Sequence, residues 1–411
     1  MHLSNATAEP RTGHQIPLLL GTVLLVNIAQ MTLGPIMSPL ARDLGFAEWQ
    51  VGVTVSSAAL MVVLTSQAWG RRAQATGFRL VLVLGLAMAL VAMTLFSVVA
   101  ALGLAGVLVG WGLFILFLLF RGMGFGVSMA AVPPTAQAYI AEATDEGPER
   151  VKGMAGVGAM QGLASIVGAV IGGILAGWGL MWPIIVAPVL LAISLGAVVW
   201  GFRALPRVEQ VEQPRPLNPL DRRVWPFLVA GFGLFLALGF IQVTAGFLVQ
   251  DRLHLGSEMT GRTTGMLMLA MGLGMVAAQA GLVPRLKWPP SMLLRWGVAA
   301  AMLGFILLLP DQGAWLMVVA FALLGLGLGL AIPGYMAGPT MLVERDEQGG
   351  LAGAVGATNG VTYVLSPLVS TLLYGWWQLL PVLVATGLLL AVMVFLLVHP
   401  AFRRPTPTAD G

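Results

Sequence analysis

Long apolar stretches without charged residues alternate with short polar segments along almost the whole chain. A helix that crosses a membrane needs about 20 mostly apolar residues, and most of these stretches are long enough. The two longest have room for two helices each. Stretches free of Asp, Glu, Lys and Arg cover 12–41, 49–70, 80–120, 122–141, 153–202, 224–250, 263–284, 296–310, 312–343 and 348–402. The pattern predicts twelve transmembrane helices and an all-α polytopic membrane protein.

Tryptophan-rich breaks divide the two longest apolar stretches. One break spans Gly177–Pro183 and the other Gly375–Pro381, and each contains two Trp residues together with Gly and Pro. Trp side chains prefer the boundary between membrane and water. Both breaks therefore predict loops at the membrane surface, and each long stretch then supplies two of the twelve helices.

The composition excludes several other classes of protein. Only 9% of the 411 residues are charged, whereas a soluble domain carries about 25%. The chain has no Cys, which excludes disulfides, thiolate metal sites and Cys nucleophiles. All four His residues lie near segment ends, so we expect no metal site and no cofactor. The basic residues form no dense stripe, and we therefore expect no binding of nucleic acid.

The loop charges predict an orientation in the membrane. With a cytoplasmic N-terminus, sixteen Lys and Arg residues fall in cytoplasmic segments and only Arg42, Arg252 and Arg262 fall on the opposite side. Cytoplasmic loops are enriched in Lys and Arg. We therefore expect both termini to face the cytoplasm.

A polar, Pro-rich segment at 203–223 divides the chain into two similar parts. Pro-rich charged segments act as spacers, so we interpret it as a cytoplasmic linker between a six-helix bundle at 1–202 and another at 224–411. The segments Gly158–Gly162 and Gly356–Gly360 are similar at an offset of 198 residues, and the two tryptophan-rich breaks match at the same offset. Such a parallel repeat is typical of a transporter with two bundles around a central cavity.

Four short motifs lie at Leu33–Leu40, Gly70–Arg79, Leu119–Gly126 and Gly168–Gly173. Together they resemble motifs of the major facilitator superfamily, specifically its twelve-helix drug–proton antiporter branch. The resemblance implies a bacterial inner-membrane transporter, with cytoplasmic gating residues in the second and fourth of these motifs and in the acidic loop after the fourth helix. These residues are Gly70, Arg72, Gln74, Gly77, Arg79, Asp145, Gly168 and Gly172. The chain departs from the family at Gln74, where the latch usually has Asp, and at Ala169, which replaces the antiporter proline.

Arg121 is a charged residue well inside the fourth predicted helix. A charge in the middle of a membrane costs about 2.5–3.5 kcal/mol or more, so it normally faces a cavity or a partner. One interpretation is a structural Arg that bonds backbone carbonyls. The other, which the resemblance favours, is an Arg in the central cavity that binds an anionic group or couples to protons.

No Asp or Glu lies deep inside any predicted helix. A buried carboxylate is the group that would titrate near neutral pH and attract a cationic drug. We therefore expect neutral, zwitterionic or anionic cargo, with any proton coupling through Arg121 and Asp43, Glu142 or the substrate itself.

Polar residues in otherwise apolar helices are further cavity candidates, although Asn and Gln often only bond a neighbouring helix. The proposed substrate-binding set, with an adaptable apolar wall, is Asn27, Gln30, Arg121, Met123, Phe125, Gln161, Gln242, Tyr335, Asn359 and Tyr363.

These features favour a secondary exporter of a small amphipathic molecule, either a drug or a self-made metabolite such as a siderophore. It would work by rocking-bundle alternating access as a monomer, with protons as the coupling ion. A lipid flippase and an uptake transporter of the same fold remain alternatives. An enzyme is disfavoured because no catalytic constellation lies inside the helices, and no phosphate-binding loop for ATP is present.

Overall fold

The computed structural model describes residues 15–144, 148–202, 218–344 and 347–403. Within these ranges every regular element is a helix. The predicted all-α membrane fold is confirmed. Eleven helices in the described part of the chain are long and apolar enough to cross a membrane. The twelfth crossing is α15 (Gln348–Trp376), whose Gly, Thr and Asn residues lower its hydropathy.

The crossings before residue 202 are built from nine α-helices and two short irregular ones. Proline and glycine explain the irregular turns, since Pro35 interrupts the first crossing and Gly122 and Gly124 lie in a π-helical turn of the fourth. These elements are α1 (Gln15–Thr32), η1 (Gly34–Ile36), α2 (Met37–Asp43), α3 (Glu48–Thr76), α4 (Phe78–Leu104), α5 (Gly110–Phe117), η2 (Leu118–Gly124), α6 (Phe125–Met129), α7 (Val132–Ala143), α8 (Pro148–Ala176) and α9 (Met181–Gly201). We call this set of helices the N half.

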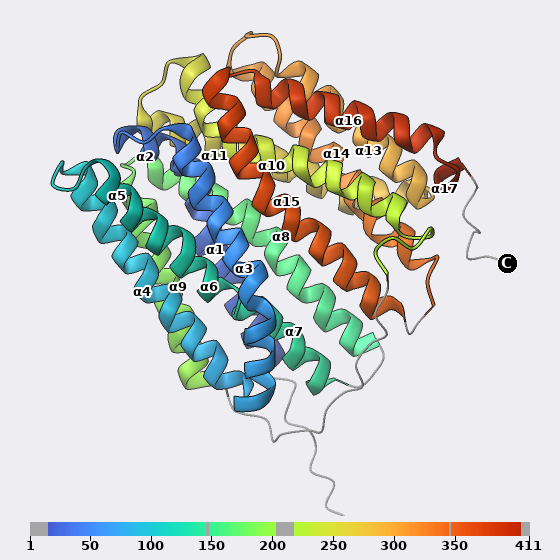
Figure 1. Cartoon of the computed structure of the whole chain (residues 1–411), viewed down its shortest axis with the longest axis horizontal. Coiled ribbons are helices and arrows are strands. Elements are labelled where there is room, and N and C mark those ends of the chain that lie inside the picture. Colours follow the sequence, from blue (N-terminus) through green and yellow to red (C-terminus); the bar gives the residue numbers. More distant parts are fainter. Residues whose placement is uncertain (1–14, 145–147, 203–217, 345–346, 404–411) are drawn as a thin grey trace, which may run out of the picture.

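We call the second set of helices the C half. It consists of α10 (Trp225–Leu253), α11 (Ser257–Val276), η3 (Ala277–Leu282), α12 (Val283–Leu286), α13 (Pro290–Leu307), α14 (Ala314–Thr340), α15, α16 (Leu380–Val398) and α17 (Pro400–Arg403). In Figure 1 the N half is blue to green and the C half is yellow to red. The predicted linker between them lies mostly outside the described residues, and the division into two domains stays a prediction.

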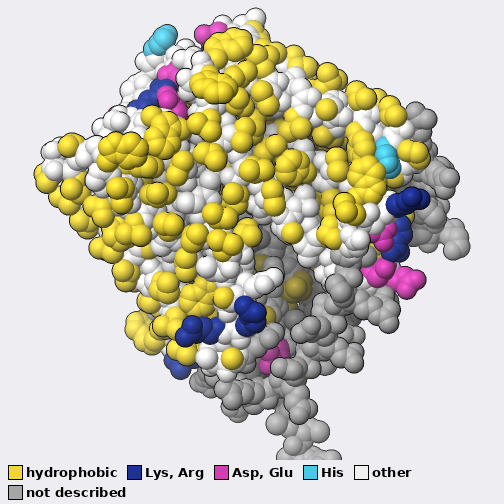
Figure 2. All heavy atoms as spheres, viewed as in Figure 1, with side chains coloured by type: hydrophobic (Ala, Val, Ile, Leu, Met, Phe, Trp, Pro, Cys, Tyr) yellow, Lys and Arg dark blue, Asp and Glu magenta, His cyan; other side chains and the backbone are white. Residues whose placement is uncertain are grey.

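Successive crossings run in opposite directions, so the loops lie at two ends of the molecule. We call the end with the turns at Gly77 and Lys287 the linker end, and the end with the turns at Gly45 and Gly313 the far end. The sequence predicts that the linker end faces the cytoplasm. Apolar side chains cover most of the visible surface, and charged ones gather near its edges (Figure 2). This distribution fits a protein whose flanks face lipid.

The halves meet mainly where α3 packs against α15 and α8 against α11, and η1 and α2 also contact α10 and α11. Glycines allow the close approach. A methyl group built on Gly52 would lie 2.6 Å from the Pro367 carbonyl oxygen, and one on Gly173 would lie 2.8 Å from the Cα of Gly265. Small residues at such positions let helices pack closely in lipid. The core is continuous across the two halves.

Candidate substrate site around Arg121

Arg121 lies on η2, where the helix widens into a π-turn halfway through the fourth crossing. Glycines on the same stretch hold it against α3, because a methyl group on Gly122 would lie 2.3 Å from Ser57 Oγ and one on Gly126 2.5 Å from the Ala58 carbonyl oxygen. π-Helical turns are frequent at functional sites. The motif around Arg121 thus serves close packing and places the guanidinium at a fixed point beside α3.

The Arg121 side chain is buried, with the residue only 7% exposed, and it is the one charged residue classed as buried in the described part of the chain. Its guanidinium lies over the Phe125 ring at 5.3 Å from the centroid. Nε is enclosed without a hydrogen-bond partner, and no carboxylate pairs with the side chain among residues that the structure describes. The backbone-bracing interpretation is therefore not what this structure shows.

An unpaired buried donor costs about 1–3 kcal/mol, and more when it is charged. A cation–π contact offsets only part of that cost. The planar guanidinium matches carboxylates and phosphates in shape and charge. Arg121 is therefore suited to bind an anionic group of a ligand.

Aromatic and amide side chains form a second cluster in the C half. The Tyr335 hydroxyl donates to Asn359 Oδ1 at 3.2 Å, and the Phe235 ring meets Tyr335 edge-on at 5.7 Å and Tyr363 at 6.3 Å. Tyr335 is fully buried because Gly231 leaves space for its ring, whereas Tyr363 is 47% exposed. The cluster combines apolar walls with hydroxyl and amide groups, as ligand sites commonly do.

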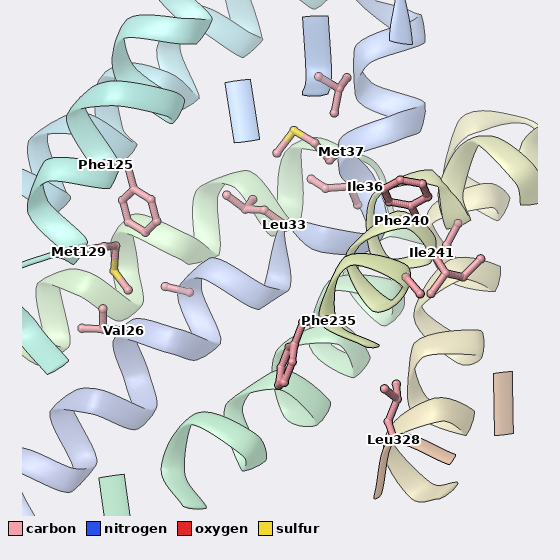
Figure 3. Packing of buried hydrophobic residues seen from close by; sticks show 14 of the residues in the cluster. Val26, Leu33, Ile36, Met37, Phe125, Met129, Phe235, Phe240, Ile241 and Leu328 are labelled. Atoms are coloured by element: carbon pink, nitrogen blue, oxygen red, sulfur yellow. The ribbon is translucent and has the colours of Figure 1, made fainter. Parts of the chain in front are cut away.

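Helix α3 places the two clusters at similar depth. Ser56 Oγ donates to the Val364 carbonyl at 2.6 Å, one residue from Tyr363, while the adjacent Ser57 contacts Gly122 beside Arg121. In Figure 3 Phe125 lies at the left of the view and Phe235 near its centre, and Leu33, the residue after α1, lies between them across the view. The structure thus brings Arg121 and the Tyr335 cluster to one level of the bundle, from opposite halves.

The other predicted site residues differ in their burial and hydrogen bonding. Asn27 is buried and its amide donates to the Val23 carbonyl of its own helix at 2.8 Å. Gln30 and Gln161 are half-buried, Gln242 is exposed, and Met123 is 39% exposed. The Asn27 amide is therefore satisfied within its own helix, whereas Gln30, Gln161, Gln242 and Met123 are accessible to a ligand.

The structure does not bring the three predicted coupling residues together. Asp43 ends α2 at the far end and accepts a hydrogen bond from Ser257 Oγ. Glu142 lies in the last turn of α7 at the linker end, and no ion pair joins either acid to Arg121 in the described ranges. Coupling of Arg121 with either acid therefore stays a prediction.

The predicted gating motif at Gly70–Arg79 covers the end of α3 and the turn into α4. Gly77 has φ of +100°, a conformation that glycine adopts readily. Arg79 donates to the Val199 carbonyl at the end of α9 at 2.8 Å, and the Arg72 side chain is exposed. The Gln74 side chain and Asp145 lie outside the described residues. The Arg79 bond anchors the end of the motif within the N half.

The motif at Gly168–Gly173 fixes α8 between the two halves. A methyl group on Gly172 would lie 2.1 Å from the Thr32 carbonyl oxygen of α1, and one on Gly168 would lie 2.6 Å from Met31 Cβ. The next residue, Gly173, meets Gly265 of α11. Adjacent glycines thus pack α8 against α1 inside the N half and against α11 across the interface.

Sequence reasoning missed an ion-pair network at the far end. Both terminal nitrogens of Arg42 bond the Asp251 carboxylate, one of them at 2.8 Å to Oδ2, and the Tyr374 hydroxyl donates to the same oxygen at 2.6 Å. Arg42 also lies over the Phe247 ring. The sequence carries one signal for this network: Arg42 and Asp251 have opposite charges, and they lie in the last turns of the first membrane crossings of the two halves. This network joins the halves at the far end.

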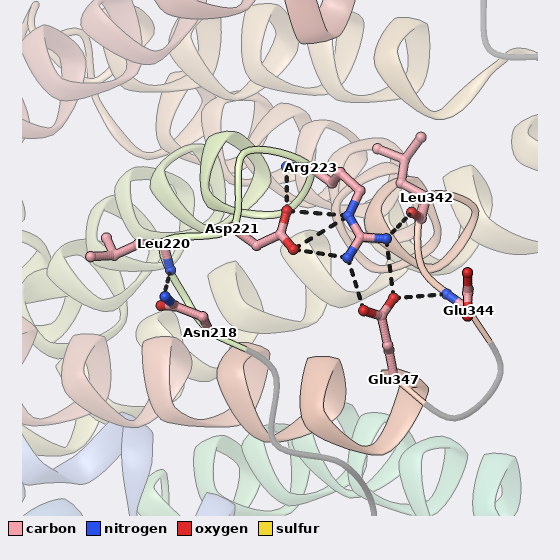
Figure 4. A network of polar contacts seen from close by, with 7 residues as sticks. All are labelled: Asn218, Leu220, Asp221, Arg223, Leu342, Glu344 and Glu347. Atoms are coloured by element: carbon pink, nitrogen blue, oxygen red, sulfur yellow. Dashed lines mark hydrogen bonds and ion pairs between the residues drawn. The ribbon is translucent and has the colours of Figure 1, made fainter.

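A different network braces the linker end of the C half. Arg223 binds Asp221 and Glu347 and also donates to the Leu342 carbonyl (Figure 4). Its hydrogen bonds lower the pKa of both carboxyls below their ordinary values. Asp221 and Arg223 lie in the described end of the predicted linker, and Leu342 and Glu347 lie in the C half, so this network does not join the C half to the N half.

The two halves are in contact at the far end and are separated at the linker end. Every cross-half hydrogen bond between described residues involves residues 38–56 of the N half, and residues 243–257 or 364–368 of the C half. Towards the linker end, Gly158, Gly162 and Gly356 face open space. Figure 2 shows the surface hollowed between the halves on this side.

Comparison with known proteins identifies the family. A sequence model of the Major Facilitator Superfamily matches residues 19–337. The chain belongs to this superfamily. Two tetracycline resistance proteins are similar over nearly their whole length. The class C protein of Escherichia coli is 25% identical, with 96% of this chain and 98% of the relative covered, and the class G protein of Vibrio anguillarum is 27% identical, with 94% and 97% covered.

Solved structures of the superfamily have the same fold. The nucleoside transporter NupG matches with a TM-score of 0.70 at 13% identity, covering 92% of this chain and 99% of that one. A bacterial homologue of the iron transporter ferroportin matches with a TM-score of 0.70 at 14% identity, covering 94% and 98%. The protein is therefore a multi-pass membrane transporter of this superfamily.

Proposed function

We propose that this transporter exports a small amphipathic molecule from the bacterial cytoplasm by alternating access. The full-length similarity to two tetracycline resistance proteins supports a drug as cargo, and a self-made metabolite such as a siderophore would use the same site. With the predicted orientation, the present conformation opens to the cytoplasm, the side from which an exporter loads. The inner membrane of a bacterium is the proposed location.

The observation that carries the proposal is the unpaired guanidinium of Arg121 in the middle of the membrane. Described Asp and Glu residues all lie in loops or near helix ends, so no carboxylate at this depth attracts an organic cation. The site therefore prefers neutral, zwitterionic or anionic cargo. Arg121 binds an acidic oxygen of the cargo, while Tyr363, Phe235 and Met123 contact the apolar surface of the cargo.

In the proposed cycle the Arg42–Asp251 network holds the far end closed during loading. Release requires the network to break while the linker ends of the two halves approach. Protons are the proposed coupling ion, taken up by an acid near a helix end or by the cargo itself. An obligatory Asp43–Arg121–Glu142 relay is not part of this cycle.

The test is an accumulation assay in cells that express the transporter. Energised cells should accumulate less tetracycline than cells with an empty vector, while ethidium accumulation should stay unchanged. Arg121→Gln should raise the tetracycline KM about ten- to hundredfold, the effect of losing one hydrogen bond to a charged group worth about 1.5–3 kcal/mol. Arg121→Lys keeps the charge and should lose less.

Arg285→Gln is a matched control, since Arg285 is an exposed residue at the linker end of the C half. It should leave transport unchanged. Efficient ethidium export would refute the proposed cargo preference. Tetracycline export that is insensitive to Arg121→Gln would show that the guanidinium is not the binding group, and increased accumulation would indicate uptake.

A further inference from the structure

A groove opens to the lipid between α8 and α11, away from the central site. Its volume is about 380 Å³, and its walls are mainly aliphatic. The lining residues are Val170, Gly173, Ile174, Gly177, Trp178, Arg262, Gly265, Met266 and Leu269. Ile174 and Met266 are at least half exposed, as side chains that face hydrocarbon would be. The groove therefore offers an elongated apolar surface to a lipid chain.

The groove takes one wall from each half. Its floor is the contact of Gly173 with Gly265, where a methyl group on Gly265 would lie 2.6 Å from the Gly173 Cα. A groove with such a floor exists only while α8 and α11 are close. Whatever occupies the groove therefore touches both halves in the far-end-closed conformation.

Charged groups border the far end of the groove. Arg262 lines it, in the second turn of α11, and Glu258 precedes Arg262 by one turn of the same helix. A methyl group on Gly177 would lie 3.5 Å from Arg262 Cδ, and one on Gly179 would lie 4.0 Å from Glu258 Oε1. Both charges thus lie beside the loop that joins α8 to α9.

Arg262 and Glu258 are not paired with each other, although their spacing would allow it. Both are exposed, and neither has an ion-pair partner in the described part of the chain. Trp178 lies at the same level and is 70% exposed, which fits the aromatic belt at a membrane surface. A long Arg side chain near a helix end can reach the headgroup layer.

We propose that this groove binds a phospholipid with a zwitterionic aminoethyl headgroup, of the phosphatidylethanolamine kind. The phosphate accepts hydrogen bonds from Arg262, the ammonium group pairs with Glu258, and one acyl chain lies along Val170, Ile174 and Leu269. A lipid with only negative charge would satisfy Arg262 and be repelled by Glu258, so charge complementarity selects the zwitterion. The bound lipid bridges the halves and stabilises the far-end-closed conformation.

The experiment is native mass spectrometry of the full-length protein, released from detergent with added phosphatidylethanolamine or phosphatidylglycerol of identical acyl chains. The wild type should retain one phosphatidylethanolamine at concentrations about tenfold below those needed for phosphatidylglycerol. Arg262→Gln should weaken retention of both lipids. Glu258→Gln should weaken only phosphatidylethanolamine, which removes the preference.

Arg285→Gln serves as the control for a general loss of surface charge, because it lies at the opposite end of the C half. It should leave the preference unchanged. Leu269→Trp, which fills the groove and keeps both charges, should lower retention of either lipid. The proposal is overturned if the wild type prefers phosphatidylglycerol, or if Arg262→Gln binds phosphatidylethanolamine as the wild type does.

Discussion

Asp251 is the residue whose substitution should most directly shift the balance between the two conformations. Its carboxylate accepts two hydrogen bonds from Arg42 of the other half and one from Tyr374. Asp251→Asn keeps the size of the side chain and removes its charge. Because the bond to Arg42 crosses the halves at the far end, it can form only while that end is closed.

The size of the shift follows from the burial of the pair. The Arg42 side chain is 25% exposed and that of Asp251 is 17% exposed, so solvent screens the interaction only in part. Hydrogen bonds to charged groups contribute about 1.5–3 kcal/mol, and partial exposure favours the lower end of this range. Since 1.4 kcal/mol is tenfold in an equilibrium, we expect the population open at the far end to rise about tenfold.

Spin-label distances can measure this population, because the chain has no Cys that would need to be removed. Labels at Ala47→Cys and Met259→Cys lie in opposite halves near the far end, and both sites are exposed. In the wild type one short distance should dominate. In Asp251→Asn a second, longer distance should appear, and Tyr374→Phe should produce it to a smaller extent.

Ser257→Ala is the matched control. It removes the hydrogen bond to Asp43, which also crosses the halves but is exposed, so its loss should change the populations less than about fivefold. An unchanged distance distribution in Asp251→Asn would refute the assignment of this network as the far-end gate. An equal shift in Ser257→Ala would show that burial of the Arg42–Asp251 pair does not determine the size of the population shift.

Three further predictions concern glycines and topology. Gly172→Leu should lower the melting temperature, because overpacking against Thr32 costs about 1–3 kcal/mol, whereas Gly21→Leu at an open position should not. Gly158→Leu and Gly356→Leu should leave the melting temperature unchanged but slow transport, because the added side chains would obstruct closure of the linker end. Gly387→Leu on α16 is the control. Full transport by both Gly158→Leu and Gly356→Leu would contradict this closure. A membrane-impermeant maleimide added to intact cells should label Val107→Cys at the far end and not Thr76→Cys, and the reverse would contradict the predicted orientation.

The fold was predictable because membrane crossings leave a one-dimensional signal. Charge-free stretches of sufficient length identify helices without any knowledge of their partners. Only α15 is ambiguous by hydropathy, and it is the helix that packs against both α3 and α10 rather than facing lipid alone. Arg121 was predictable for the same reason, since a single charge within an apolar stretch stands out.

The pairing of polar groups was less predictable, because it depends on contacts between distant segments. Arg42 and Asp251 are separated by 209 residues, and each alone reads as an ordinary charge at a helix end. Asn27 read as a cavity residue, although its amide is satisfied by its own helix. Coupling of Arg121 with Asp43, Glu142 or the substrate stays a prediction, because the sequence places both acids near helix ends but does not show how far each lies from Arg121.

The internal repeat connects the closed far end with the open linker end. Helices α8 and α15 are equivalent in the two halves, and each makes close glycine contacts across the interface towards the far end, at Gly173 and through Gly52 of α3. The same two helices carry Gly158 and Gly356 towards the linker end, where a methyl group built on either glycine would have no neighbour within 4 Å. Closure of the linker end would bring small residues of α8 and α15 into contact across the interface. Glycines already make such contacts at the far end. A rocking motion then exchanges one set of glycine contacts for another, and ion pairs such as Arg42–Asp251 need only bias the balance between two packed states.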